Sequence, residues 1–279
     1  MILVGADGSR AALDAVSWAV QEARLRRTAL RVVHVMPAWP LQMAEDAPYA
    51  DVGRWMRDGA AATLTDALGR VEEEGGGVET DTELLPGEPR SALLEAAREA
   101  ELLVVGSHGL GGFRGMLLGS VALGVTGRAP CPVAIVRDLP ARSRGEVVVG
   151  VDGSPEGAAA VDLAFTEAAL RGAPLRAVHA WGRPAVPLQV RAAAGSERRA
   201  LAEALAGRGE TNPDVKVIEQ VEQGHPVAVL RDLSARADLL VVGSRGRGEL
   251  GGLLLGSVSH SLIHHAACPL IVVPGPPER

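Results

Sequence analysis

The chain has 279 residues, of which 47% are hydrophobic and 22% charged, a composition that predicts a globular protein with two domains. Its formal net charge of −6, without a cluster of Lys and Arg, excludes nucleic acid as the main partner, because such binding depends on basic side chains. Two cysteines give no disulfide framework and no segment is apolar enough to span a membrane, so we expect a cytoplasmic protein with no membrane partner.

In chain order, short β-branched runs alternate with longer segments of helical period. The strand-like start at residues 1–6 predicts no signal peptide. Pro89 and Pro226 suit the first turn of a helix, and Ser120 and Ser257 are expected to be the N-caps of two short helices. The first half is expected to hold strands near 1–6, 29–36, 78–85, 101–106 and 132–137, with helices near 10–27 and 54–74.

The sequence contains two copies of one pattern, which indicates a duplicated domain. Residues 7–9 recur at 152–154, an offset of 145, whereas Gly106 recurs at Gly243, an offset of 137, so the second copy is shorter by eight residues. Strands alternating with helices predict an α/β fold of two tandem doubly wound domains, each a five-stranded mainly parallel sheet with helices on both faces. The expected domains are 1–137 and 145–279, with a short linker between them.

Each copy carries a glycine-rich loop directly after an apolar strand, at 106–120 and at 243–257, with the same spacing. In an open parallel sheet, ligands bind beyond the carboxyl ends of the strands where strand order reverses. Both loops lead into an expected helix N-terminus, where backbone N–H groups attract anions. The repeated spacing favours phosphate binding over ordinary turn glycines, and the absence of Gly-Lys-Ser or Gly-Lys-Thr excludes the P-loop.

The spacing Gly-x2-Gly-x9-Gly-Ser resembles the ATP-binding motif of the universal stress protein family, and the resemblance covers almost the whole chain twice. The Asp-Gly-Ser after the first strand, the histidine near the end of the second and the closing Cys-Pro also fit. The resemblance implies binding of ATP, ADP or AMP, with Mg²⁺ bridging the phosphates. The nucleotide-binding positions that it implies are Asp7, Val35, Gly106, Gly109, Gly119, Ser120 and Val121, and in the second copy Asp152, Ala180, Gly243, Gly246, Gly256, Ser257 and Val258.

Within this set, the resemblance places the aspartates Asp7 and Asp152 beside the ribose and phosphates, and Val35 and Ala180 against the adenine. Ala180 is smaller than valine, so the second adenine pocket is expected to be looser. A different interpretation of Asp7 and Asp152 is that they cap the first helix of each domain, and one side chain can serve both roles.

The functional hypothesis is a stress-response protein that changes state or partner when it binds nucleotide. No nucleophile, base and orienting group can be named, so no catalytic residue is proposed. The alternatives are an enzyme that hydrolyses ATP or transfers an adenylyl group, and a flavin-binding electron carrier. The adenylyl-transferase motifs His-x-Gly-His and Ser-Gly-Gly-x-Asp-Ser do not occur.

Two apolar closing strands, 133–136 and 270–273, would form exposed sheet edges unless they are paired. The resemblance implies that the two domains pair with each other through these strands about a pseudo-twofold axis, with a homodimer as a further assembly. Residues 37–48 hold the extra length of the first copy. This segment, with Trp39, Met43 or Tyr49, is either a lid over the first nucleotide or a surface excursion.

Some histidines and cysteines have a spacing or position that is also found in metal sites or catalytic sites. His260, His264 and Cys268 recur every four residues, as metal ligands on a helix can, but an exposed or interface-facing helix is the expected alternative and no metal ligand is proposed. Cys131 and Cys268 are expected to be buried residues at strand starts. His34 and His179 end strands and are expected to be structural histidines with satisfied hydrogen bonds.

Overall fold

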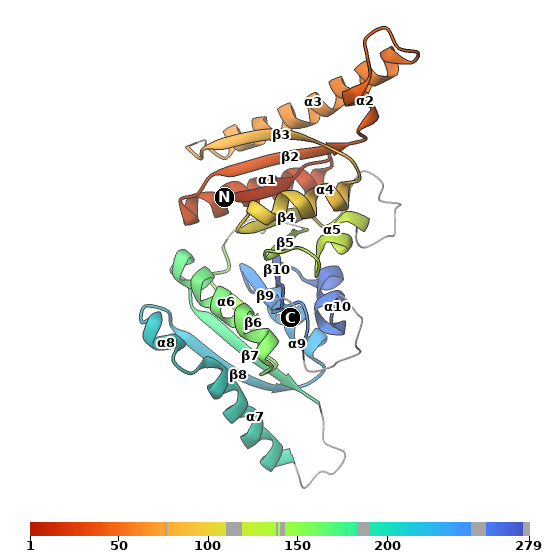
Figure 1. The fold of residues 1–279 in the computed structure, drawn as a ribbon. Helices are drawn as coiled ribbons and strands as arrows, with labels where there is room; N and C mark the ends of the chain where they lie inside the picture. Colours follow the sequence, from red (N-terminus) through yellow and green to blue (C-terminus); the bar gives the residue numbers. More distant parts are fainter. Residues whose placement is uncertain are drawn as a thin grey trace. The chain divides into compact units, whose positions relative to one another are not determined.

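The computed structural model describes residues 1–75, 77–109, 119–137, 139, 143–182, 190–246 and 255–275, without the side chains of residues 190–194. The chain divides into two compact units, Met1–Arg137 and Asp138–Arg279. Each unit alternates strands and helices along the chain, as the colours of Figure 1 show.

In the first unit, all neighbouring strands are parallel and lie in the order β3-β2-β1-β4-β5. Helices α1 and α3 contact each other over one face of the sheet, and α4 and α5 contact each other over the opposite face (Figure 1). The elements are β1 (Ile2–Gly5), α1 (Arg10–Arg26), β2 (Leu30–Met36), α2 (Trp39–Gln42), α3 (Ala50–Glu73), β3 (Thr80–Pro86), α4 (Pro89–Ala96), the 3₁₀ turn η1 (Ala97–Glu99), β4 (Leu102–Gly106), α5 (Ser120–Val125) and β5 (Val133–Val136).

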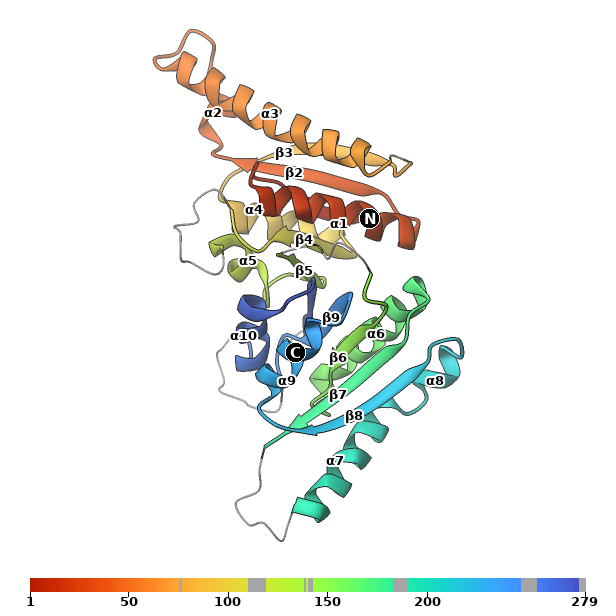
Figure 2. The same ribbon diagram turned by 180° about the vertical axis from the view of Figure 1, so that it is seen from behind.

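The second unit repeats this arrangement, with its parallel strands in the order β10-β9-β6-β7-β8. Figure 2 shows the same unit from behind, with α6 and α7 on one side of the sheet. The elements are β6 (Val147–Gly150), the 3₁₀ turn η2 (Pro155–Gly157), α6 (Ala158–Arg171), β7 (Leu175–Trp181), α7 (Val190–Leu205), α8 (Arg208–Thr211), β8 (Val217–Gln223), α9 (Pro226–Ser234), β9 (Leu239–Gly243), α10 (Ser257–His265) and β10 (Leu270–Val273).

The central strands form the core of each unit. In β1, Ile2, Leu3 and Val4 are fully buried, and the neighbouring β4 is apolar over its whole length. A parallel sheet covered by helices on both faces needs such continuous apolar runs, because no face is left for water. The expected α/β fold with two doubly wound domains is therefore confirmed.

The order of strands fixes where a ligand can bind. In the first unit the chain moves outward from β1 to β3 and then returns to β4 on the other side of β1. The strand order thus reverses between β1 and β4, and between β6 and β9 in the second unit. Loops that leave the carboxyl ends of these strands diverge there and leave a crevice.

Local signals set the element boundaries. Pro89 and Pro226 are the first residues of α4 and α9, as expected. The helix expected at 54–74 begins earlier, at Ala50, directly after Tyr49, which has a left-handed conformation (φ 69°).

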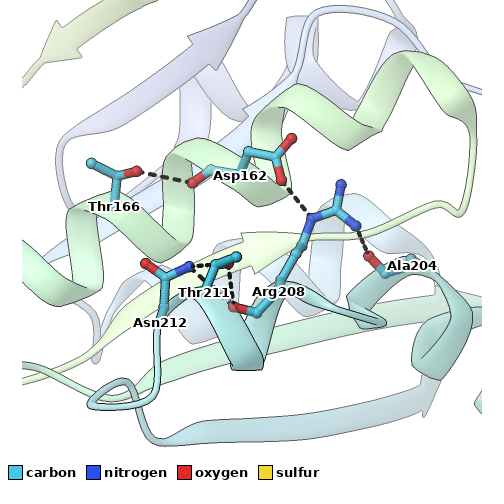
Figure 3. Close-up of polar contacts among 6 residues, drawn as sticks. All are labelled: Asp162, Thr166, Ala204, Arg208, Thr211 and Asn212. Carbon is cyan, nitrogen blue, oxygen red and sulfur yellow. Dashed lines mark hydrogen bonds and ion pairs between the residues drawn. The ribbon is translucent and has the colours of Figure 1, made fainter.

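The short helix α8 is held to α6 by polar contacts at the surface (Figure 3). Arg208 donates from Nε to Oδ1 of Asp162 (2.6 Å) and from Nη1 to the carbonyl of Ala204 (2.7 Å). Thr211 and Asn212 both donate to the carbonyl of Arg208 (2.9 and 3.0 Å) and close the turn. Because the Asp162 side chain is exposed, this ion pair contributes little stability and mainly sets the position of α8.

A carboxylate anchors the segment that leads into β6. Asp238 accepts hydrogen bonds from the Ser143 hydroxyl (2.7 Å) and from the backbone N–H groups of Arg144 (2.5 Å) and Gly145 (2.7 Å). The guanidinium of Arg144 in turn donates to the carbonyls of Ser234 and Ala267 (both 3.0 Å). This segment is thus fixed within the second unit both by the carboxylate of Asp238 and by the guanidinium of Arg144.

We expect the substitution Asp238→Ala to lower the free energy of unfolding by about 1–3 kcal/mol, because two backbone donors and a hydroxyl lose a charged acceptor. Urea unfolding followed by circular dichroism measures this difference. Asp214→Ala is the control, since Asp214 is exposed on the same unit. Equal effects of the two substitutions would show that Asp238 anchors nothing.

Candidate nucleotide site

The second unit has a cavity of about 440 Å³ at the carboxyl ends of β6, β7 and β9. This is the crevice where the strand order reverses, and its volume lies in the range of small-molecule sites. All the positions predicted for the second copy line this one cavity: Asp152, Ala180, Gly243, Gly246, Gly256, Ser257 and Val258.

Other walls of the cavity were not predicted from the sequence. Val178, Leu230 and Val242 provide an apolar surface, and His179, Glu197 and Arg245 provide polar groups. Arg245 lies inside the predicted glycine loop and could have been found from its place there. Glu197 could not, because it lies on α7, which the loop spacing does not reach.

The aspartate after the first strand of each unit organises the next turn. Oδ1 of Asp152 accepts from the N–H (2.9 Å) and the hydroxyl (2.7 Å) of Ser154, whose hydroxyl oxygen in turn accepts from the N–H of Gly157 (3.1 Å). In the first unit, Oδ1 of Asp7 accepts from the N–H of Ser9 (3.0 Å), which is the N-cap of α1. The side-chain caps are therefore Ser9 for α1 and Ser154 for the 3₁₀ turn η2, and the two aspartates hold these serines in place instead of capping the helices themselves.

The other carboxylate oxygen lies against the glycine loop. A Cβ atom at Gly109 would overlap Oδ2 of Asp7, and a Cβ atom at Gly246 would overlap Oδ2 of Asp152. Neither glycine has a positive φ, so a larger residue here would displace the aspartate carboxylate without straining the backbone. In each copy the aspartate thus lies directly against the start of the glycine loop.

Gly106 has a packing role that the sequence did not predict. A Cβ atom here would lie 2.7 Å from the backbone carbon of Ala11 and 2.9 Å from the nitrogen of Ala12, both at the start of α1. The glycine is thus already required by the close packing of β4 against α1. Its counterpart Gly243 is less tightly enclosed, with its nearest atom at 3.1 Å.

The far end of each glycine loop returns to the strand from which it starts. Gly119 donates from its N–H to the carbonyl of Ser107 (2.7 Å), and Gly256 does the same to Ser244 (2.8 Å). These glycines are the N-caps of α5 and α10, and neither makes a side-chain capping bond. The expectation that Ser120 and Ser257 are the N-caps is wrong, because both already have helical positions. Val121 and Val258 follow them in the first turns.

The residues assigned to the adenine lie at the ends of β2 and β7. Val35 and Ala180 are half-buried, and each follows a histidine that bonds the end of the neighbouring strand. Nδ1 of His34 lies 2.8 Å from the carbonyl oxygen of Ala6, and Nδ1 of His179 lies 2.7 Å from that of Val151. Both histidines thus tie strand ends together, as expected.

Residues 37–48, the segment expected to hold the extra length of the first copy, pack on α3, and α3 itself (24 residues) is longer than its counterpart α7 (16 residues). Met43 lies against Gly53, and the carbonyl of Pro40 accepts a hydrogen bond from Arg57. The Trp39 side chain is exposed, and so is that of Tyr49. A role as a lid stays a prediction.

The two cysteines are buried and free. Burial raises the pKa of the Cys131 thiol to about 11 and that of Cys268 to about 12. The rings of His260 and His264 lie 5.3 Å apart on α10, but this helix ends at His265, so Cys268 does not continue the spacing of four residues on it. In the part of the chain that the structure describes, no three His, Cys, Asp or Glu side chains are grouped as metal ligands.

The sequence profile described as the universal stress protein family matches residues 1–137 and again residues 144–274, so the chain belongs to this family in its tandem form. It is 38% identical over 287 residues to the universal stress protein Rv2005c of Mycobacterium tuberculosis, covering 97% of this chain and 96% of the relative. It is 37% identical over 282 residues to Rv2623 of the same organism, covering 97% and 95%.

A solved structure shows the same fold. The crystal structure of a universal stress protein from Archaeoglobus fulgidus superposes with a TM-score of 0.71 at 23% identity, covering 98% of this chain and 97% of that one. Among the helices that the structure describes, none has the length and apolar character needed to cross a membrane.

Gly106→Ala is expected to lower the free energy of unfolding by about 1–3 kcal/mol, because the new methyl group meets the rigid backbone of α1. Gly69→Ala is the matched control. Nothing lies near its Cβ position inside α3, so alanine there should stabilise the chain by about 0.5–1 kcal/mol. Chemical denaturation measures both, and a Gly106→Ala chain as stable as the parent would contradict the packing role.

The raised thiol pKa values predict slow alkylation of the folded chain. At pH 8 both thiols stay protonated, and the thiolate is the nucleophile, so iodoacetamide should modify neither cysteine until urea unfolds the chain. Mass spectrometry of samples quenched over time counts the modified residues. Rapid labelling in the absence of urea would show that a cysteine is accessible and ionised.

Proposed function

We propose that this protein binds one adenine nucleotide at each glycine loop and acts as a regulator that changes state or partner on binding. The observation that carries the proposal is that the predicted positions of the second copy line a single cavity of about 440 Å³. ATP is the proposed ligand, with ADP and AMP as members of the same class.

One part of the cavity offers groups that suit phosphates, and another part offers an apolar surface that suits a base. Gly246 and the first turn of α10, with Ser257 and Val258, offer backbone N–H groups to phosphate oxygens, since the first N–H groups of a helix have no acceptor within it. Arg245 adds a permanent positive charge at this end. Ala180 and the apolar wall at Leu230 suit a flat base.

Magnesium is part of the proposal. Mg²⁺ prefers oxygen ligands and is commonly held by one or two carboxylates together with substrate phosphates. Among the predicted residues of the cavity, the carboxylate of Asp152 and the hydroxyl of Ser257 have side-chain oxygens that could bind Mg²⁺. In the first copy Asp7 takes the place of Asp152. The residues therefore fit a metal ion that is bound mainly through the nucleotide, and that neutralises phosphate charge when bound.

The groups around the second cavity do not include a recognisable catalytic set. Among the described residues, no hydroxyl is hydrogen-bonded to the ring of His179, whose partners are a backbone carbonyl and Glu197, so no nucleophile with a paired base can be named and we favour a regulator over an enzyme. Hydrolysis of ATP or adenylyl transfer is the alternative, and release of inorganic phosphate or pyrophosphate from bound ATP would support it. A cytoplasmic location and pairing of the closing strands, within the chain or in a homodimer, stay predictions.

Calorimetry with ATP and Mg²⁺ should give two equivalents per chain, since each copy holds an aspartate against its glycine loop. Gly109→Val or Gly246→Val should leave one equivalent, because the side chain displaces the aspartate and obstructs the loop. Gly59→Val is the matched control, as nothing lies near its Cβ position.

A parent chain that binds no nucleotide would overturn the proposed function. One equivalent in the parent chain would mean that one copy has only a structural role. If both loop substitutions leave two equivalents, the nucleotides bind elsewhere on the chain.

A further inference from the structure

The second cavity contains an ion-pairing arrangement that the nucleotide assignment does not use. His179 is 4% exposed, and its Nε2 lies 2.7 Å from Oε2 of Glu197, which lies on α7. Both residues line the cavity, and 24% of the Glu197 side chain stays exposed. In the first unit His34 makes the same bond through Nδ1, but no carboxylate among the described residues bonds its ring.

The ring of His179 lies between the end of β6 and α7. Nδ1 lies 2.7 Å from the carbonyl oxygen of Val151, and Nε2 lies 2.7 Å from Oε2 of Glu197. The ring therefore engages Oε2. The other carboxylate oxygen, Oε1, is an acceptor of hydrogen bonds and has no hydrogen to donate.

This acceptor belongs to the part of the cavity assigned to the base. His179 directly precedes Ala180, the position assigned to the adenine, and the next residues along the chain, Trp181 and Gly182, also line the cavity. Glu197 is bonded to this run of β7. If Oε1 of Glu197 lies beside a bound base, an N–H group of that base can donate a hydrogen bond to it.

We propose that Glu197 accepts a hydrogen bond from the exocyclic amino group of the adenine bound in the second domain. The inference rests on the proposed function and adds a specificity-determining residue to one of its two sites. His179 is a positioning residue, since it holds Oε2 and leaves Oε1 to accept from the base. Among the described residues of the first domain no carboxylate is bonded to His34, so the two domains are expected to differ in how they select a base.

A base without an amino group leaves Oε1 desolvated and without a donor, and sites built around a buried acceptor reject such ligands. The matched probe is purine riboside triphosphate, which is ATP without its 6-amino group. Its affinity for the second site should be about tenfold or more below that of ATP.

The experiment is calorimetry of both triphosphates with Mg²⁺ on a Gly109→Val chain, so that the heat comes from the second site. Glu197→Ala should reduce the affinity ratio of the two ligands to about one, because no acceptor remains for the amino group to satisfy. Glu197→Gln should give an intermediate ratio, since an uncharged amide oxygen accepts more weakly than a carboxylate. Glu203→Ala, an exposed glutamate on the same helix, should keep the parent ratio.

A purely structural Glu197, which only holds α7 to β7, predicts a different result. Its loss would then weaken both ligands equally and leave the ratio unchanged, and this outcome overturns the inference while the nucleotide site stands. Failure of the parent chain to bind ATP at all would overturn the proposed function together with the inference. Circular dichroism of each variant confirms that the affinities are compared between folded chains.

Discussion

The contact between one carboxylate and one glycine organises each half of this protein. Asp7 and Asp152 follow the first strand of their units, and their Oδ2 atoms occupy the space where a side chain on Gly109 or Gly246 would lie. The contact joins two loops that are far apart in sequence but leave adjacent parallel strands. Because the other carboxylate oxygen closes the turn into the next helix, the backbone of the site is fixed from both sides.

The order of strands and helices in each unit could be predicted well from the sequence, because the same pattern of apolar runs occurs twice. The apolar run of β4 has no polar position, which is the signature of a strand buried on both faces, and its recurrence at β9 shows the duplication. Element boundaries were less predictable where they depend on one residue. Tyr49 begins α3 in a left-handed conformation, and no pattern in the sequence signals that an aromatic residue does so.

For the site, spacing predicted which backbone segments come together but not why each glycine is there. Gly106 and Gly109 belong to one motif, yet Gly106 packs on the first turn of α1 and Gly109 on a carboxylate. The helix caps show a similar limit. A serine at a helix start suggests an N-cap, but Gly119 is the last residue with an extended backbone (φ −75°, ψ 146°), held by its hydrogen bond to Ser107, and Ser120 is already helical. Tertiary contacts decided both cases, and a linear pattern does not contain them.

The residues that distinguish the two sites lie outside the repeated motif. The contact of the aspartate with the second glycine of the motif is common to both copies, at Gly109 and at Gly246. At the rim, the position of His108 in the first copy is held by Arg245 in the second, and only the second histidine has a carboxylate bonded to it among the described residues. Packing therefore constrains the glycine and aspartate positions that both copies share. The side chains around them, such as His108 and Arg245, can differ between the copies. A duplicated chain can in this way keep one fold for both domains while each site acquires its own charge and hydrogen-bonding pattern.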